Sequence, residues 1–120
     1  MKRSIQTLTI EGFKSIEMIN DFPFRALNIL IGGNGSGKSN LISFFRFVRN
    51  IMNRSLQVHV QKNGGIEAHL FKGSKFTKQI LGRINFEKYH YEFILEPTSD
   101  NRLIISNEII DSNMPNRVRD

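Results

Sequence analysis

The fold is decided by residues 29–40, which read Ile29-Leu30-Ile31-Gly32-Gly33-Asn34-Gly35-Ser36-Gly37-Lys38-Ser39-Asn40. Gly32, Gly37, Lys38 and Ser39 stand at the fixed positions of the pattern G-x-x-x-x-G-K-S/T, the signature of a phosphate-binding loop. An apolar run from residue 27 to residue 31 enters the segment, and a helical pattern of apolar residues leaves it. The motif therefore has the strand–loop–helix setting that it requires.

Each residue type in this loop suits the binding of a nucleoside triphosphate. Glycines allow positive φ angles and a close approach of the backbone, so that successive N–H groups can converge on an anion. The N-terminus of the following helix adds free N–H groups and the positive end of its dipole. Lys38 supplies a charge for the β- and γ-phosphates, and Ser39 supplies a hydroxyl ligand for Mg²⁺. We therefore predict a site for ATP and Mg²⁺, with Ser39 on the metal, formed by Gly32, Gly33, Asn34, Gly35, Ser36, Gly37, Lys38, Ser39 and Asn40.

Two other interpretations of the loop fit less well. A plain Gly-rich turn before a helix would make Lys38 a solvated charge and leave the full motif unexplained. The dinucleotide fingerprint G-x-G-x-x-G begins with Gly33 and Gly35, but Lys38 stands where its third glycine belongs. A triphosphate is the better ligand.

The composition is that of one soluble domain or part of one. The chain has 120 residues, 39% of them hydrophobic, which is enough for a single core. No span approaches the roughly 18 apolar residues of a membrane helix, and no apolar signal segment follows the charged N-terminus. The absence of cysteine excludes a disulfide framework and a cysteine zinc site. We expect a cytoplasmic location and no contact with membranes.

The net charge of +6 and the pI near 10 make DNA a candidate partner. The basic residues are nevertheless spread along the chain, and the only local cluster is Lys72, Lys75 and Lys78. A solvated basic face is the simpler interpretation of that cluster. The three histidines have no metal-ligand spacing, and two of them, His59 and His90, lie in sequence patterns that are typical of a β-strand.

Hydrophobic periodicity predicts two strands, a buried strand and a helix in the first half. Alternating apolar residues predict strands over residues 4–11 and 16–24 and a strand covered on both faces over residues 26–31. After Lys38 the apolar residues fall on one helical face, while Ile42 and Phe47 lie off it. The face consists of Leu41, Phe44, Phe45, Val48, Ile51 and Met52.

The second half is predicted to be mostly β-structure. Residues 53–78 suggest loops around a short strand at residues 68–71, since glycines punctuate them. Residues 79–86 and 88–95 predict a hairpin, and residues 103–106 begin a further strand that residues 108–110 could extend. We expect residues 1–110 to form part of one ATPase domain and residues 111–120 to form a frayed polar tail.

The segment Ile10-Glu11-Gly12-Phe13-Lys14-Ser15-Ile16, followed by the loop and by Lys38-Ser39-Asn40-Leu41, resembles the N-terminus of the SMC/RecF-like branch of ABC-class ATPases. The chain is most similar to predicted AAA-type ATPases related to RecF. The resemblance implies an α/β fold, the N-terminal lobe of a P-loop NTPase, with a mixed sheet and antiparallel hairpins around the P-loop helix. It places Lys14 and Ser15 near the nucleotide, although a plain surface turn explains them equally well. It also implies a glutamine that reaches the metal and the attacking water, for which Gln57, Gln61 and Gln79 are the open alternatives.

Two parts that this class needs for hydrolysis are missing from the sequence. A Walker B strand requires about four apolar residues followed by Asp and Glu, and neither Ile104–Glu108 nor Ile109–Ser112 meets that requirement. The Ser-Gly signature segment is absent too. The resemblance therefore implies the N-terminal portion of a larger ATPase in DNA repair, recombination or phage defence, acting as a dimer or with a complementary C-terminal polypeptide. A non-hydrolysing nucleotide- or nucleic-acid-binding module and a non-functional gene remnant are the alternatives.

Overall fold

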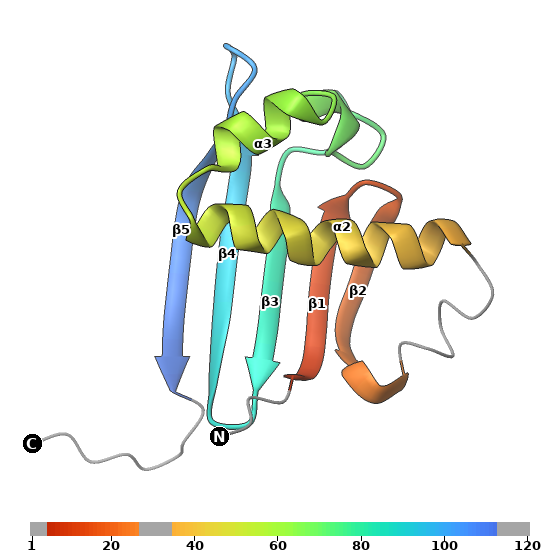
Figure 1. The fold of residues 1–120 in the computed structure, drawn as a ribbon, viewed down its shortest axis with the longest axis vertical. Coiled ribbons are helices and arrows are strands. Elements are labelled where there is room, and N and C mark those ends of the chain that lie inside the picture. The colour runs from red at the N-terminus through yellow and green to blue at the C-terminus, as the bar shows by residue number, and fades with distance from the viewer. Residues whose placement is uncertain (1–4, 27–34, 113–120) are drawn as a thin grey trace, which may run out of the picture.

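The computed structural model describes residues 5–26 and 35–112, and within the second range it describes side chains from Lys38 onward. The described chain forms a five-stranded sheet with two α-helices on one of its faces (Figure 1). Its elements in chain order are β1 (Ile5–Phe13), β2 (Ile16–Pro23), η1 (Phe24–Ala26), α2 (Gly35–Met52), α3 (Leu56–Lys62), η2 (Ile66–Ala68), β3 (Ile80–Phe86), β4 (Tyr89–Pro97) and β5 (Leu103–Ser112).

The sheet has the order β2-β1-β3-β4-β5, and each neighbouring pair is antiparallel. The two strands predicted before the loop and the hairpin predicted at residues 79–95 are confirmed as β1, β2, β3 and β4. The predicted mixed sheet would need the strand at residues 26–31. Ala26 ends η1, and residues 27–31 lie outside the described residues. The described part of the sheet is therefore antiparallel throughout.

Helix α2 packs its buried face across the sheet and forms the centre of the core. Phe44 and Phe47 have no exposed surface, and they pack with Phe13 of β1 at ring-centroid distances of 5.7 and 5.0 Å. The predicted face was rotated from the observed one, because Phe47 is buried whereas Met52 is 55% exposed.

The prediction of loops around a short strand over residues 53–78 was correct for the loop at residues 71–78 but missed two helical segments. The segment contains α3 and η2, and its only strand-like feature among the described residues is an isolated bridge from Leu70 to Phe13. Leu56 and Val60 lie four residues apart on α3, so both are buried on one side of a short helix. His59 consequently lies on a helix and not on a strand.

Strand β5 is longer than predicted and contains one irregularity. It continues to Ser112, so Asp111 and Ser112 belong to the sheet and not to a polar tail. The register to β4 shifts between Ile94 and Leu95, which leaves Ser106 as an extra residue on β5. None of the helices in the described part of the chain is long and apolar enough to cross a membrane.

Candidate nucleotide-binding site

Helix α2 begins at Gly35, inside the predicted phosphate-binding loop. Lys38 and Ser39 lie in its first turns with exposed side chains, and Asn40 is half-buried. The first turn carries no acidic side chain, so no carboxylate competes with an anion for the N–H groups there. Gly32, Gly33 and Asn34 lie outside the described residues, and for Gly35, Ser36 and Gly37 only the helical backbone is described. The helix start thus suits an anion, while the loop before it remains a prediction.

The turn between β1 and β2 lies against the beginning of α2. The side-chain amide of Asn40 donates a hydrogen bond to Oγ of Ser15, which joins residues 25 positions apart. Behind the turn, Lys14 donates its backbone N–H to His69 O at 2.9 Å, and Gly12 O accepts one from Phe71 N at 3.0 Å. The structure therefore brings Ser15, and with it the β1–β2 turn, beside the first turns of α2.

A pair of histidines, His59 and His69, lies under this turn, and no motif or spacing in the sequence indicates that the two meet. His69 is buried and stacks on Phe47 with ring centroids 5.7 Å apart, and its Nδ1 lies 2.7 Å from Gly65 O. Because a carbonyl only accepts, Nδ1 carries the proton in that contact. His59 lies 5.9 Å from His69, ring to ring. Burial lowers the pKa of both histidines, and the positive charge of Lys14 lowers it further.

We expect this pair to make the fold sensitive to acid. The folded pKa of His69 lies below the unfolded value of about 6.5, so the unfolded chain binds a proton first. The stabilisation is fully present above pH 6.5 and is lost as the pH falls below it. Urea unfolding of the wild type between pH 8 and pH 5 should show a falling free energy of unfolding, and His69→Gln should flatten that slope. An unchanged slope in the variant would contradict the assignment to His69.

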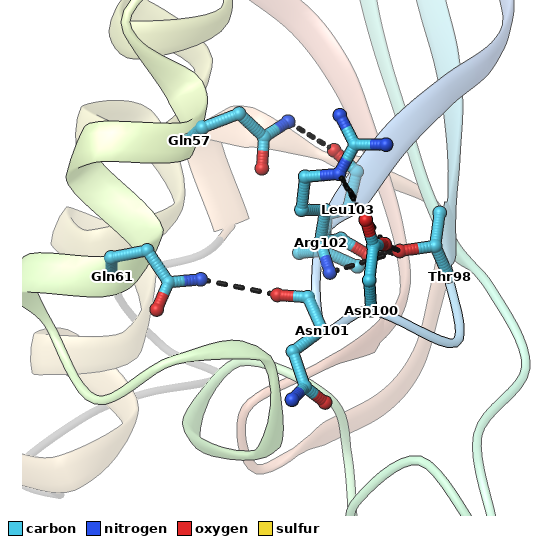
Figure 2. A network of polar contacts seen from close by, with 7 residues as sticks. All are labelled: Gln57, Gln61, Thr98, Asp100, Asn101, Arg102 and Leu103. Carbon is cyan, nitrogen blue, oxygen red and sulfur yellow. Dashed lines mark hydrogen bonds and ion pairs between the residues drawn. The ribbon is translucent and has the colours of Figure 1, made fainter.

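Two of the three candidate glutamines hold α3 to the turn between β4 and β5 (Figure 2). Gln57 donates its Nε2 hydrogen to Leu103 O at 2.6 Å, and Gln61 donates to Asn101 O at 3.1 Å. The same turn is closed by contacts among Thr98, Asp100 and Arg102. Gln57 and Gln61 therefore each connect α3 to the start of β5 or the turn before it through a hydrogen bond. Gln79 directly precedes β3, and nothing in its surroundings assigns it a catalytic role.

The carboxylates closest to a Walker B pattern lie at the far edge of the sheet. Glu108 and Asp111 belong to β5, while the hairpin beside the start of α2 is β1–β2 at the other edge (Figure 1). Three strand spacings separate β1 from β5, which is about 14 Å. Glu108 is moreover engaged, because it accepts a hydrogen bond of 2.7 Å from the Tyr91 hydroxyl. The described residues contain no group of three or more His, Asp or Glu side chains that could hold a metal ion.

In the basic cluster at residues 72–78, the side chains of Lys72 and Lys78 contact residues of the same loop. Lys72 Nζ lies over the rings of Phe71 and Phe76, at 5.5 and 5.2 Å from their centroids. Lys78 Nζ donates to Ser74 O at 3.0 Å. This geometry agrees with a solvated basic face that shields two aromatic rings.

Comparison with known proteins gives one family match and two partial relatives. Residues 27–112 match the family described as "AAA domain, putative AbiEii toxin, Type IV TA system". The chain is 36% identical over 59 residues to the DNA replication and repair protein RecF of Shewanella denitrificans, an alignment that covers 49% of this chain and 16% of RecF. It is 50% identical over 46 residues to urease accessory protein 2 of Cryptococcus neoformans var. grubii serotype A, which covers 37% of this chain and 4% of that protein. No solved structure matches the chain.

The family match overlaps the candidate site and sets its family. The family match includes the predicted phosphate-binding loop, α2 and every later element that the structure describes, and it covers more than half of the chain. The chain spans about one sixth of the RecF relative and a smaller share of the other. The chain therefore belongs to this AAA-domain family of P-loop ATPases, and it is RecF-like.

Proposed function

We propose that residues 32–40 bind Mg·ATP and that this chain is the nucleotide-binding part of a RecF-like ATPase. The observation that carries the proposal is that α2 starts at Gly35 with Lys38 and Ser39 exposed and with no acidic side chain in its first turn. A helix start of this kind, preceded by glycines, favours phosphate through its N–H groups and its dipole. Membership of an AAA-domain family gives independent support for a nucleotide ligand.

Within this proposal each residue has one role. The backbone amides from Gly33 to Lys38 surround the phosphates, and the Lys38 ammonium neutralises charge on the β- and γ-phosphate oxygens. The exposed Ser39 hydroxyl is a hard oxygen ligand, and it would hold Mg²⁺, which polarises the terminal phosphate when bound. Asn40, the last residue of the proposed site, has a further contact. It holds Ser15, and with it the β1–β2 turn, against the site.

We further propose that the chain by itself binds ATP better than it hydrolyses it. Glu108 and Asp111 are the carboxylates nearest to a Walker B pattern, and they lie at the opposite edge of the sheet. Hydrolysis needs a carboxylate that orients the attacking water, which a second polypeptide or a dimer partner would supply. Steady phosphate release by the isolated chain that depends on Lys38 would contradict this part of the proposal.

The RecF relative also supports a role with DNA, in a cytoplasmic machine for repair, recombination or phage defence. RecF is named for DNA replication and repair, and the net charge of +6 suits a polyanionic partner. Such a role predicts duplex binding that weakens steeply as salt rises. Binding that is equally weak at low and physiological salt would argue against DNA as the partner.

Lys38→Ala is expected to reduce the affinity for Mg·ATP by at least about 100-fold. The variant loses a charge-assisted contact to two phosphates at an exposed position, so the fold should be unaffected. Titration with a fluorescent ATP analogue measures the affinity, and circular dichroism checks the fold. Arg49→Ala is a matched control, because Arg49 is an exposed cation at the other end of the same helix. Equal affinities in Lys38→Ala and the wild type would reject the site.

A thermal unfolding curve separates this proposal from a non-functional remnant. A ligand that binds only the folded state raises the unfolding midpoint in proportion to the logarithm of its concentration. We expect one cooperative transition that Mg·ATP raises in the wild type and leaves unchanged in Lys38→Ala. A broad transition that nucleotide does not move would favour the remnant.

A further inference from the structure

Strand β5 has an exposed edge with an unusual number of aliphatic side chains. It is the last strand in the sheet order, and no strand within residues 5–26 and 35–112 pairs with its outer side. Four of its isoleucines are exposed, with Ile110 at 68% of its surface. The others are Ile104, Ile105 and Ile109. A long, apolar edge strand is a template for pairing with another strand.

The register to β4 shows that these side chains lie on both faces of the sheet. Side chains that are directly opposite each other in an antiparallel pair point to the same face. Ile105 and Ile110 lie opposite Leu95 and Tyr91, which are buried on the side of α2. Ile104 and Ile109 lie opposite Glu96 and Glu92, on the other side. A strand that is apolar on both faces is typical of the interior of a sheet and not of its edge.

The apolar surface continues beside the strand. A cavity of about 360 Å³ lies where β5 meets the end of α2 and the start of α3. Its lining is mostly aliphatic, from Ile51, Leu56, Val58, Ile104 and Ile105, with the polar residues Arg54, Ser55 and Gln57 beside them. Val58 is 61% exposed. A strand added to β5 would therefore extend the sheet and also cover this apolar surface.

The edge is complementary to itself. Because Ser106 is an extra residue, the ladder positions of β5 run from Ile105 directly to Asn107. An antiparallel copy related by a two-fold axis at Asn107 would place Ile104 opposite Ile109 of the partner subunit and Leu103 opposite Ile110 of the partner subunit. All these pairs share a face, and Glu108 would lie opposite Ile105 of the partner subunit. If the two-fold axis lay one ladder position further on, at Glu108, the faces would still match, but the two copies of Glu108 would lie opposite each other. Repulsion between their like charges disfavours that register.

We propose that two copies of this chain pair through β5, antiparallel and centred on Asn107, to form one continuous ten-stranded sheet. The interface is isologous, since the same strand edge serves both copies. It lies at the sheet edge opposite the β1–β2 hairpin, so it leaves the start of α2 open and does not depend on nucleotide.

A single cysteine tests both the interface and its register. The chain has no cysteine, so any introduced thiol is unique. Asn107→Cys should form a disulfide-linked dimer under mild oxidation, because the two Cβ atoms meet at the axis within the range of a disulfide. Asp111→Cys lies four ladder positions from the axis, so its two copies would be about 27 Å apart and should remain monomeric. Met18→Cys, on the other edge strand, should also remain monomeric. Equal cross-linking of the three variants, or none in Asn107→Cys, would overturn the proposal.

Sedimentation velocity gives a second test on the full chain, one that needs no covalent cross-link. The wild type should show a concentration-dependent dimer, and Ile109→Lys should weaken it by about tenfold or more, because it sets a lysine against an isoleucine. Met18→Lys makes the same change at a 53% exposed residue on β2 and should leave the dimer intact. Circular dichroism confirms that each variant is folded. A wild type that stays monomeric, or a dimer that Ile109→Lys leaves unchanged, would overturn the proposal.

Discussion

Replacement of Gly12 by alanine should destabilise the protein by about 3 kcal/mol or more, for two separate reasons. Gly12 has a φ angle of +75°, which costs an alanine about 1–2 kcal/mol. An added Cβ would also lie 2.5 Å from the carbonyl oxygen of Gln79 and 2.8 Å from Cγ2 of Thr77, closer than folded proteins tolerate. The first of these atoms is backbone, so β1 and the start of β3 would have to separate.

Gly65→Ala is the matched control for this prediction. Gly65 has the same φ of +75°, but an added Cβ would meet no atom within 4 Å. Gly65 has a ψ angle of −174°, a conformation that is nearly restricted to glycine, so a backbone cost of about 1–3 kcal/mol should remain, but without the added clash. Chemical denaturation of the two variants measures the difference directly. If Gly12→Ala lost no more stability than Gly65→Ala, the close packing of the β1–β2 turn against Gln79 would be incorrect.

Phe44→Ala should cost about 3–5 kcal/mol, because it leaves a cavity where α2 meets the sheet. The Phe44 ring has no exposed surface, and it packs edge-on against Phe13 at 5.7 Å and parallel to Phe93 at 6.2 Å. It also closes on Gly82, where an added Cβ would come within 3.0 Å of it. These three neighbours belong to strands β1, β3 and β4, whose pairing in the sheet limits how far they can move into the space.

Phe76→Ala is the corresponding control, since the Phe76 ring is 56% exposed and contacts Lys72 and Phe71 on the surface. It should cost no more than about 1 kcal/mol. Urea unfolding midpoints of the two variants provide the comparison. Similar losses in both would show that the centre of the core does not lie at the junction of α2 and the sheet.

The strands were predictable because their side chains alternate over enough residues. In β4, Tyr91, Phe93 and Leu95 are buried between exposed or half-buried neighbours, as their spacing in the sequence indicates. Helix α3 was not predictable, since it has only seven residues and the sequence Val58-His59-Val60 within it is typical of a strand. It is helical because Leu56 and Val60 pack against the core that α2 and the sheet provide. Tertiary packing overrides local propensity in so short a segment.

The sequence likewise predicts some features of the candidate site and not others. The motif identified the start of a helix, and α2 does begin within it, at Gly35. The contact from Asn40 to Ser15 joins residues that the sequence pattern cannot bring together, because it depends on how the β1–β2 hairpin crosses the helix. The buried His69 had no spacing signal, since Phe47, on which it stacks, comes from α2 and is distant in the sequence.

The backbone amide groups of residues 33–38 are the part of the proposed site that would contact the phosphates directly. The chain has 120 residues and is small enough for amide NMR spectra, in which each backbone N–H gives its own signal. Titration of the full chain with Mg·ATP should shift the amide signals of Gly33, Gly35, Gly37 and Lys38 together and saturably, and Lys38→Ala should abolish those shifts. Signals of the loop that stay in place at saturating nucleotide, while signals elsewhere move, would contradict the proposed site.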